Sequence, residues 1–156
     1  MQDELFMKEA IRLARQGMLA NKGGPFGAVV VKNGQIIGRG YNQVLSAKDP
    51  TAHAEILAIR EACRHLDSFQ LNGCTIYTSC APCPMCLGAL YWARPDRVVY
   101  AAGSRRAAQA GFDDQLIYEE LAKPEADRRL LFEQLLADEG DKLFIEWQHK
   151  ADKIQY

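Results

Sequence analysis

Three cysteines at steps of three residues, with prolines between them, stand in the stretch SCAPCPMCLG, residues 79–88. Cys83 and Cys86 fall where a helix is predicted to begin, and residues three apart share a helical face. Pro82 and Pro84 suit that position, because the amides of a first helical turn have no intrahelical partner. The partial positive charge of a helix start also favours the thiolate form. Two thiolates are therefore predicted to project from one helix start, as a redox pair or as metal ligands.

His53 and Glu55, in the stretch HAE, begin the preceding predicted helix. Residues two apart do not share a side face of a helix, so these two can meet only off its N-terminal end. If the two helices lie side by side on one sheet, their starts bring together an imidazole, two thiolates and a carboxylate. Zinc accepts such nitrogen and sulfur ligands tetrahedrally, and three protein ligands leave the fourth position for water, as in catalytic sites.

The predicted zinc ligands are His53, Cys83 and Cys86. A zinc-bound hydroxide is then the nucleophile, and Glu55 takes a proton from the water and passes it to the leaving amine. H-x-E followed by P-C-x-x-C is the signature of zinc-dependent deaminases of nucleobases. The combined pattern predicts hydrolytic removal of an amino group from an amidine carbon.

Two other interpretations remain open for the cysteines. Cys80 could be a fourth ligand that closes a structural zinc module, but that leaves Glu55 without a task. Pro82 separates Cys80 from the helix, which favours a strand-end cysteine. A redox protein would instead form a reversible disulfide between Cys83 and Cys86.

Hydrophobic periodicity predicts the elements that position these residues. The expected helices are 3–19, 53–63, 83–92, 113–121 and 141–153. The expected strands are 26–32, 35–41, 74–78 and 97–101. Asn33-Gly34 predicts a type I′ turn between the first two strands, and 74–101 predicts a parallel strand–helix–strand unit. Residues 130–136 fit a strand or a helix equally well.

The overall composition indicates one α/β domain spanning residues 1–156. The chain is 48% hydrophobic and its net charge is −1, which gives no support for a nucleic-acid partner. Five cysteines, an odd number, argue against a disulfide framework. The N-terminus lacks the pattern of a secretory signal, and no apolar run reaches the ~18 residues of a membrane span. We expect a soluble cytoplasmic protein that contacts no membrane.

Three stretches give the chain a clear resemblance to bacterial guanine deaminases of the cytidine deaminase superfamily. They are PTAHAEILAIREAC, TSCAPCPMCLGALYWARPDRVVYAA and GFDDQLIYEEL. The resemblance implies a three-layer α/β/α fold around a five-stranded mixed sheet, with 130–136 as a strand. It also implies one zinc ion per subunit, conversion of guanine to xanthine and ammonia, and a homodimer. In that dimer the C-terminal segment, about 138–156, can exchange between subunits.

The same resemblance implies which residues contact the purine base. They are Phe26, Asn42, Ala54, Trp92, Asp114 and Tyr156. Ala81 departs from the family pattern, because many relatives carry glutamate there. Two alternative substrates follow from the shared zinc motif: the adenosine of a tRNA anticodon, or a cytosine or triazine ring. A tRNA substrate calls for clustered basic residues, which the near-neutral chain does not suggest.

Overall fold

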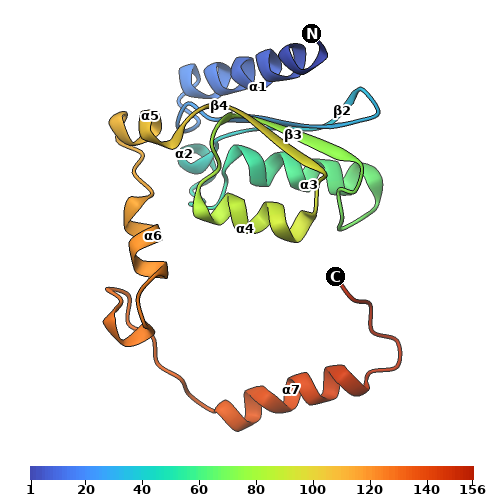
Figure 1. The fold of residues 1–156 in the computed structure, drawn as a ribbon, viewed down its shortest axis with the longest axis vertical. Coiled ribbons are helices and arrows are strands. Elements are labelled where there is room, and N and C mark those ends of the chain that lie inside the picture. The colour runs from blue at the N-terminus through green and yellow to red at the C-terminus, as the bar shows by residue number, and fades with distance from the viewer. The chain divides into compact units, whose positions relative to one another are not determined.

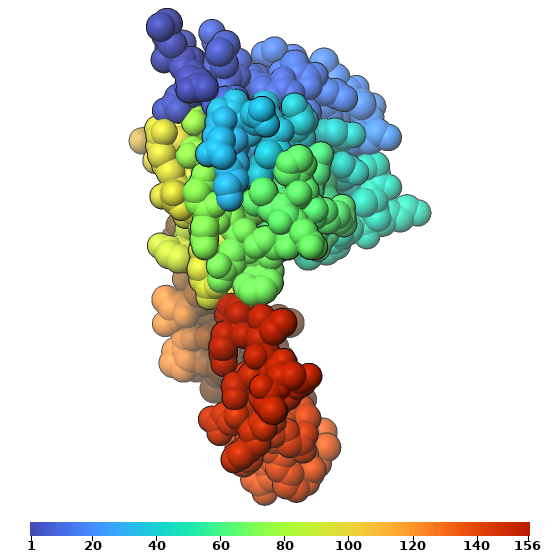
Figure 2. All heavy atoms as spheres, turned by 90° about the vertical axis from the view of Figure 1, so that its right-hand side faces the viewer, coloured from blue at the N-terminus to red at the C-terminus, as the bar shows by residue number.

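The first two strands are joined by the tight turn that Asn33 and Gly34 predict. The computed structural model describes all 156 residues, and in it β1 (Gly27–Lys32) and β2 (Gln35–Tyr41) pair antiparallel. Both turn residues have positive φ, 51° for Asn33 and 75° for Gly34, as a type I′ turn requires. The predicted hairpin is confirmed. Figure 2 shows its turn in light blue beside the green segment before β3, where Lys32 Nζ donates to Asn72 O at 3.0 Å.

One mixed sheet of four strands, in the order β2-β1-β3-β4, forms the centre of the first part of the chain. β3 (Cys74–Cys80) pairs antiparallel with β1 and parallel with β4 (Arg97–Ala102). The helix α4 (Pro84–Ala93) connects the two parallel strands, as predicted for this segment.

Helices cover both faces of the sheet (Figure 1). α1 (Gln2–Leu19) packs on one face, where Leu13 joins Val29 and Tyr77 in an apolar cluster. α3 (Ala54–Leu66) and α4 lie on the other face, over a cluster that includes Ile76. The predicted three layers are confirmed.

The prediction of a fifth strand is wrong. The sheet ends at β4, and residues 130–136 form neither a strand nor a helix. Leu131 and Leu135 in this run are 78% and 85% exposed. A strand needs a neighbouring strand for its backbone hydrogen bonds. The run LLFEQLL supplies apolar side chains but no partner of its own.

The chain divides into two units, Met1–Asp114 and Gln115–Tyr156. The first unit also holds two short helices that periodicity did not predict, α2 (Val44–Ala47) and α5 (Ser104–Gln109).

The second unit contains α6 (Gln115–Leu121), the 3₁₀ turn η1 (Glu125–Asp127) and α7 (Ala137–His149). α7 begins and ends four residues before the predicted helix 141–153. No helix in either unit has the length and apolar character needed to cross a membrane.

Candidate metal centre and pocket

The predicted ligands sit at the starts of two helices. His53 is the residue before α3, and Cys83 is the residue before α4. Both have extended backbone, with ψ of 153° and 169°, which turns their side chains off the helix ends. Cys83 Sγ accepts a hydrogen bond from the amide of Cys86 at 3.4 Å, so the first cysteine caps the helix that carries the second.

Glycines in β2 set how closely α3 approaches the sheet. A Cβ atom on Gly40 would lie 2.1 Å from the carbonyl oxygen of Ala54, and one on Gly38 would lie 2.3 Å from that of Ala58. The helix therefore rests directly on the strand backbone. This contact places the start of α3 beside the start of α4, on the same face of the sheet (Figure 1).

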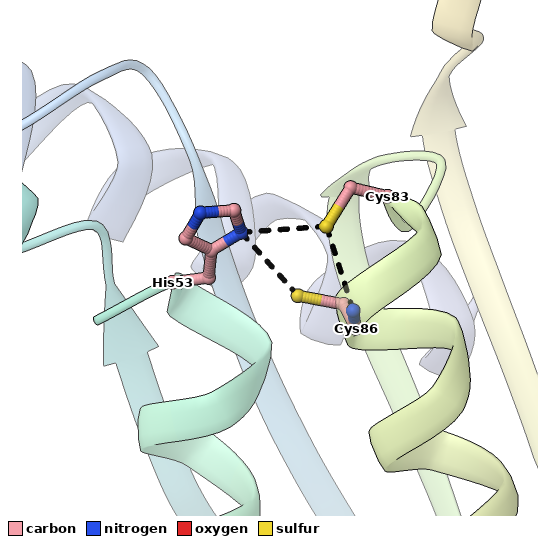
Figure 3. Close-up of side chains that lie close together, drawn as sticks. All are labelled: His53, Cys83 and Cys86. Atoms are coloured by element: carbon pink, nitrogen blue, oxygen red, sulfur yellow. Dashed lines mark hydrogen bonds between the residues drawn. The ribbon is translucent and has the colours of Figure 1, made fainter. Parts of the chain in front are cut away.

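The three predicted ligands converge where the helix starts meet. Ligand atoms of His53, Cys83 and Cys86 all lie within 4.8 Å of one another. Figure 3 shows Nδ1 of His53 facing both sulfur atoms, each at 3.5 Å. One imidazole nitrogen and two thiol sulfurs at this spacing match the donor set of a three-ligand zinc site. Cys80 ends β3 and is not a member of the cluster, as expected for a strand-end cysteine.

The contacts within the cluster shift the pKa values of the two thiols in opposite directions. The contact with Cys86, supported by that with His53, lowers the pKa of Cys83 to about 4. The contact with Cys83, together with burial, raises the pKa of Cys86. The hydrogen bond with Cys83 raises the pKa of His53. Both sulfurs must be deprotonated to bind a metal, so binding at this site releases protons.

Glu55 places a carboxylate next to the ligand cluster. The residue is 6% exposed, and its Oε2 lies 3.4 Å from Cys86 Sγ. Burial raises the pKa of Glu55. A carboxyl group with a raised pKa beside the predicted metal ligands is suited to carry protons.

A pocket of about 460 Å³ opens above the cluster. Its lining includes His53, Glu55 and Cys83 together with three predicted substrate residues, Phe26, Asn42 and Asp114. The size is that of a small-molecule site, with a few polar groups in an apolar wall. Burial raises the pKa of Asp114.

Three other predicted substrate contacts are not among the lining residues of this pocket. Ala54 is fully buried at the start of α3, and Trp92 is 65% exposed on α4. Tyr156 belongs to the second unit. Contacts of these three residues with substrate stay predictions.

Several lining residues were not predicted. The ring of Phe112 meets Phe26 edge-to-face, with centroids 4.9 Å apart, so Phe26 lines the pocket as one of a pair of rings. Phe112 stands two residues before the predicted contact Asp114, and this proximity in the sequence was the signal that could have identified it as a pocket residue. Ala81 also lines the pocket, so the position at which this chain departs from the family pattern lies in the candidate site.

Comparisons with known proteins agree with this geometry. Residues 1–102 match the cytidine and deoxycytidylate deaminase zinc-binding region. The guanine deaminase of Bacillus subtilis (strain 168) is 53% identical over 156 residues, which is 100% of both chains. An X-ray structure of guanine deaminase from Bacillus subtilis superposes with a TM-score of 0.95 and covers 98% of each chain at 53% identity. The tRNA-specific adenosine deaminase of the same strain is 42% identical over 127 residues, 81% of this chain and 78% of the relative. This chain therefore belongs to the zinc-binding cytidine and deoxycytidylate deaminase family, as a relative of bacterial guanine deaminase.

Proposed function

We propose that the protein hydrolyses guanine to xanthine and ammonia with one zinc ion per chain. The observation that carries the proposal is the cluster of one imidazole and two thiols beside the buried carboxylate of Glu55. The full-length similarity to a guanine deaminase selects the ring among those that such a site could accept.

His53, Cys83 and Cys86 hold the metal in this proposal, and Glu55 carries protons. When bound, zinc activates water as a nucleophile at neutral pH. Glu55 would take the two protons of the attacking water in turn, and would pass one to the ring nitrogen and the other to the departing amine. In the net reaction a carbon–oxygen bond replaces the carbon–nitrogen bond at C2 of guanine, and ammonia leaves.

The remaining pocket residues orient the base. Asn42 Oδ1 accepts from the Val44 amide at 3.1 Å, so Nδ2 is the amide group left to donate to a ring acceptor. Asp114 is suited to accept from the N–H groups on the amino edge of guanine. Phe26 and Phe112 supply the apolar wall.

The proposal also covers the assembly of the protein and the role of its C-terminal segment. We infer a homodimer in which the segment of about 138–156 exchanges between subunits and brings Tyr156 to the partner's pocket. Support comes from exposed apolar side chains along this segment: Leu143, Phe144 and Ile154 are 64%, 71% and 69% exposed. We place the enzyme in the cytoplasm, where thiols of such a site remain reduced.

The test is ammonia release by the purified protein with its zinc content measured. We expect release from guanine, and none of comparable rate from adenine, cytosine, ammeline or an anticodon stem-loop. Glu55→Ala should retain zinc and lose about 10²–10⁴-fold in turnover, the contribution of general acid–base catalysis. The similarity to a tRNA-specific adenosine deaminase makes deamination of a tRNA adenosine the second candidate. Ammonia release from the stem-loop but not from guanine would favour that reaction.

A further inference from the structure

Thr78 is a buried hydroxyl on the strand face that carries the site. Ile76, Thr78 and Cys80 alternate along β3 on the side of α3 and α4, whereas Tyr77 faces α1. Thr78 is 1% exposed. A buried hydroxyl costs free energy unless it makes a hydrogen bond, so the partner of this group indicates its task.

The single proton of this hydroxyl has two acceptors within reach, and it can be donated to one of them at a time. Thr78 Oγ1 is 3.3 Å from Glu55 Oε1 and 3.1 Å from the carbonyl oxygen of Cys80. The other oxygen of the same carboxylate, Oε2, faces Cys86 Sγ at 3.4 Å. One oxygen of Glu55 is thus held toward the sheet while the other faces the ligand cluster.

We propose that Thr78 is a positioning residue that holds Oε1 of Glu55 so that Oε2 faces the reacting groups. A glutamate side chain has several freely rotating bonds, and fixing it costs entropy that a rigid neighbour can offset. A proton carrier acts only within hydrogen-bond reach of the group it serves. Thr78 is well suited to this task because the paired backbone of β3 fixes its own position. The inference rests on the proposed function, because deamination is what requires the carboxylate to face the cluster.

Three substitutions at Thr78 and one control on the same strand test the role of the hydroxyl. Thr78→Val keeps the shape and removes the hydrogen bond, whereas Thr78→Ser keeps the hydroxyl and removes a methyl group. Thr75→Val is the matched control, because Thr75 lies on the same strand and faces the opposite side of the sheet. Thr78→Ala is a second variant lacking the hydroxyl, to be used if the valine variant does not fold.

We expect Thr78→Val to lower kcat for guanine by about 10- to 100-fold, the effect of one hydrogen bond to a charged group. The KM and the zinc content should stay within about twofold of wild type, since neither the ligands nor the pocket wall changes. Thr78→Ser should recover most of kcat, and Thr75→Val should match wild type. A lower zinc content or a higher KM with unchanged kcat would overturn the inference in favour of a purely structural role.

A double-mutant cycle tests whether Thr78 acts through Glu55. In a Glu55→Ala background, Thr78→Val should not reduce the residual turnover further. An equal reduction in both backgrounds would overturn the inference.

A crystal structure of the zinc-loaded Thr78→Val protein gives a readout that does not depend on activity. The carboxylate of Glu55 should leave the position it holds in wild type, and an unmoved carboxylate would again overturn the inference. This readout tests the role of Thr78 separately from the proposed substrate. A wild-type protein that is inactive on guanine would refute the proposed substrate. The position of Glu55 in the variant would still show whether Thr78 holds it.

Discussion

At the scale of single residues, the position of the Asn42 side chain in the pocket depends on the absence of a side chain at Gly23. Asn42 is buried, and its Oδ1 accepts from the Val44 amide. A Cβ atom added to Gly23 would lie 2.0 Å from that Oδ1 and 2.7 Å from the Asn42 carbonyl oxygen. Glycine is required at position 23 because any side chain would push the amide of Asn42 out of place.

Gly23→Ala should therefore raise the KM for guanine by about five- to tenfold, because the base loses one well-placed donor. The zinc content should not change. Gly88→Ala is the control, since a Cβ atom there meets nothing within 4 Å. Steady-state kinetics on both variants give the measurement, and equal KM values for the two would contradict the assigned orientation of Asn42.

The three-ligand arrangement makes opposite predictions for two neighbouring cysteines. Cys83→Ala removes one of three ligands and should reduce zinc to well below one per chain, with turnover lost in parallel. Cys80→Ala should retain zinc, because Cys80 lies outside the cluster. Metal analysis of both proteins decides the matter. Loss of zinc from both variants would instead indicate the closed structural site with four ligands.

At the scale of elements, α1 is tied to the sheet by a polar link at its first turn. Tyr77 donates to Asp3 Oδ1 at 2.6 Å, and Arg97 pairs with Asp3 Oδ2 at 2.6 Å. Burial and the bond to Asp3 raise the pKa of Tyr77 to about 12. The neutral phenol is the form that donates, so the link persists as long as the proton remains.

Tyr77→Phe should lower the free energy of unfolding by about 1–2 kcal/mol at pH 8. Because the folded pKa is raised above the usual value of about 10, the stabilisation is complete below pH 10 and declines as the pH rises toward 12. The difference between wild type and variant should thus shrink between pH 8 and pH 11 in denaturant titrations. Tyr91→Phe, at a 78% exposed position, should behave as wild type throughout. A difference independent of pH would show that the phenol proton plays no part.

At the scale of the whole molecule, the second unit leaves many of its apolar side chains exposed. All residues of α7 are exposed, including Leu143, Phe144 and Ile145. Within the unit, Glu120 accepts from Lys123 and from the Arg129 amide, and Arg128 stacks over the ring of Phe132. Large exposed apolar surface of this kind supports the exchange of this segment that we propose.

Deleting residues 150–156 should reduce turnover or raise the KM for guanine while zinc stays bound, because Tyr156 is proposed to close a pocket whose metal ligands lie elsewhere. Kinetics and metal analysis of the truncated protein give the test. Sedimentation should show a dimer for the full-length chain. Unchanged kinetics after truncation would refute the closing role of the tail.

The sequence by itself predicted the residues of the metal cluster and most local elements. His53, Glu55, Cys83 and Cys86 could be identified because zinc chemistry needs those residue types at helix starts, and Asn33-Gly34 because few other residues adopt positive φ. These signals are local, so the chain carries them in short stretches. The separation of the zinc site from Cys80 was also predictable, because Pro82 separates Cys80 from the start of the helix.

Only the tertiary structure decided which further residues contact the site residues and how many strands pair. Phe112 meets Phe26 and Thr78 meets Glu55 across gaps of 86 and 23 residues. The missing fifth strand has the same origin: residues 130–136 are apolar enough for a strand, but strand formation depends on a pairing edge that their own sequence does not contain. Contacts between distant segments depend on packing, and packing is not encoded in any single stretch.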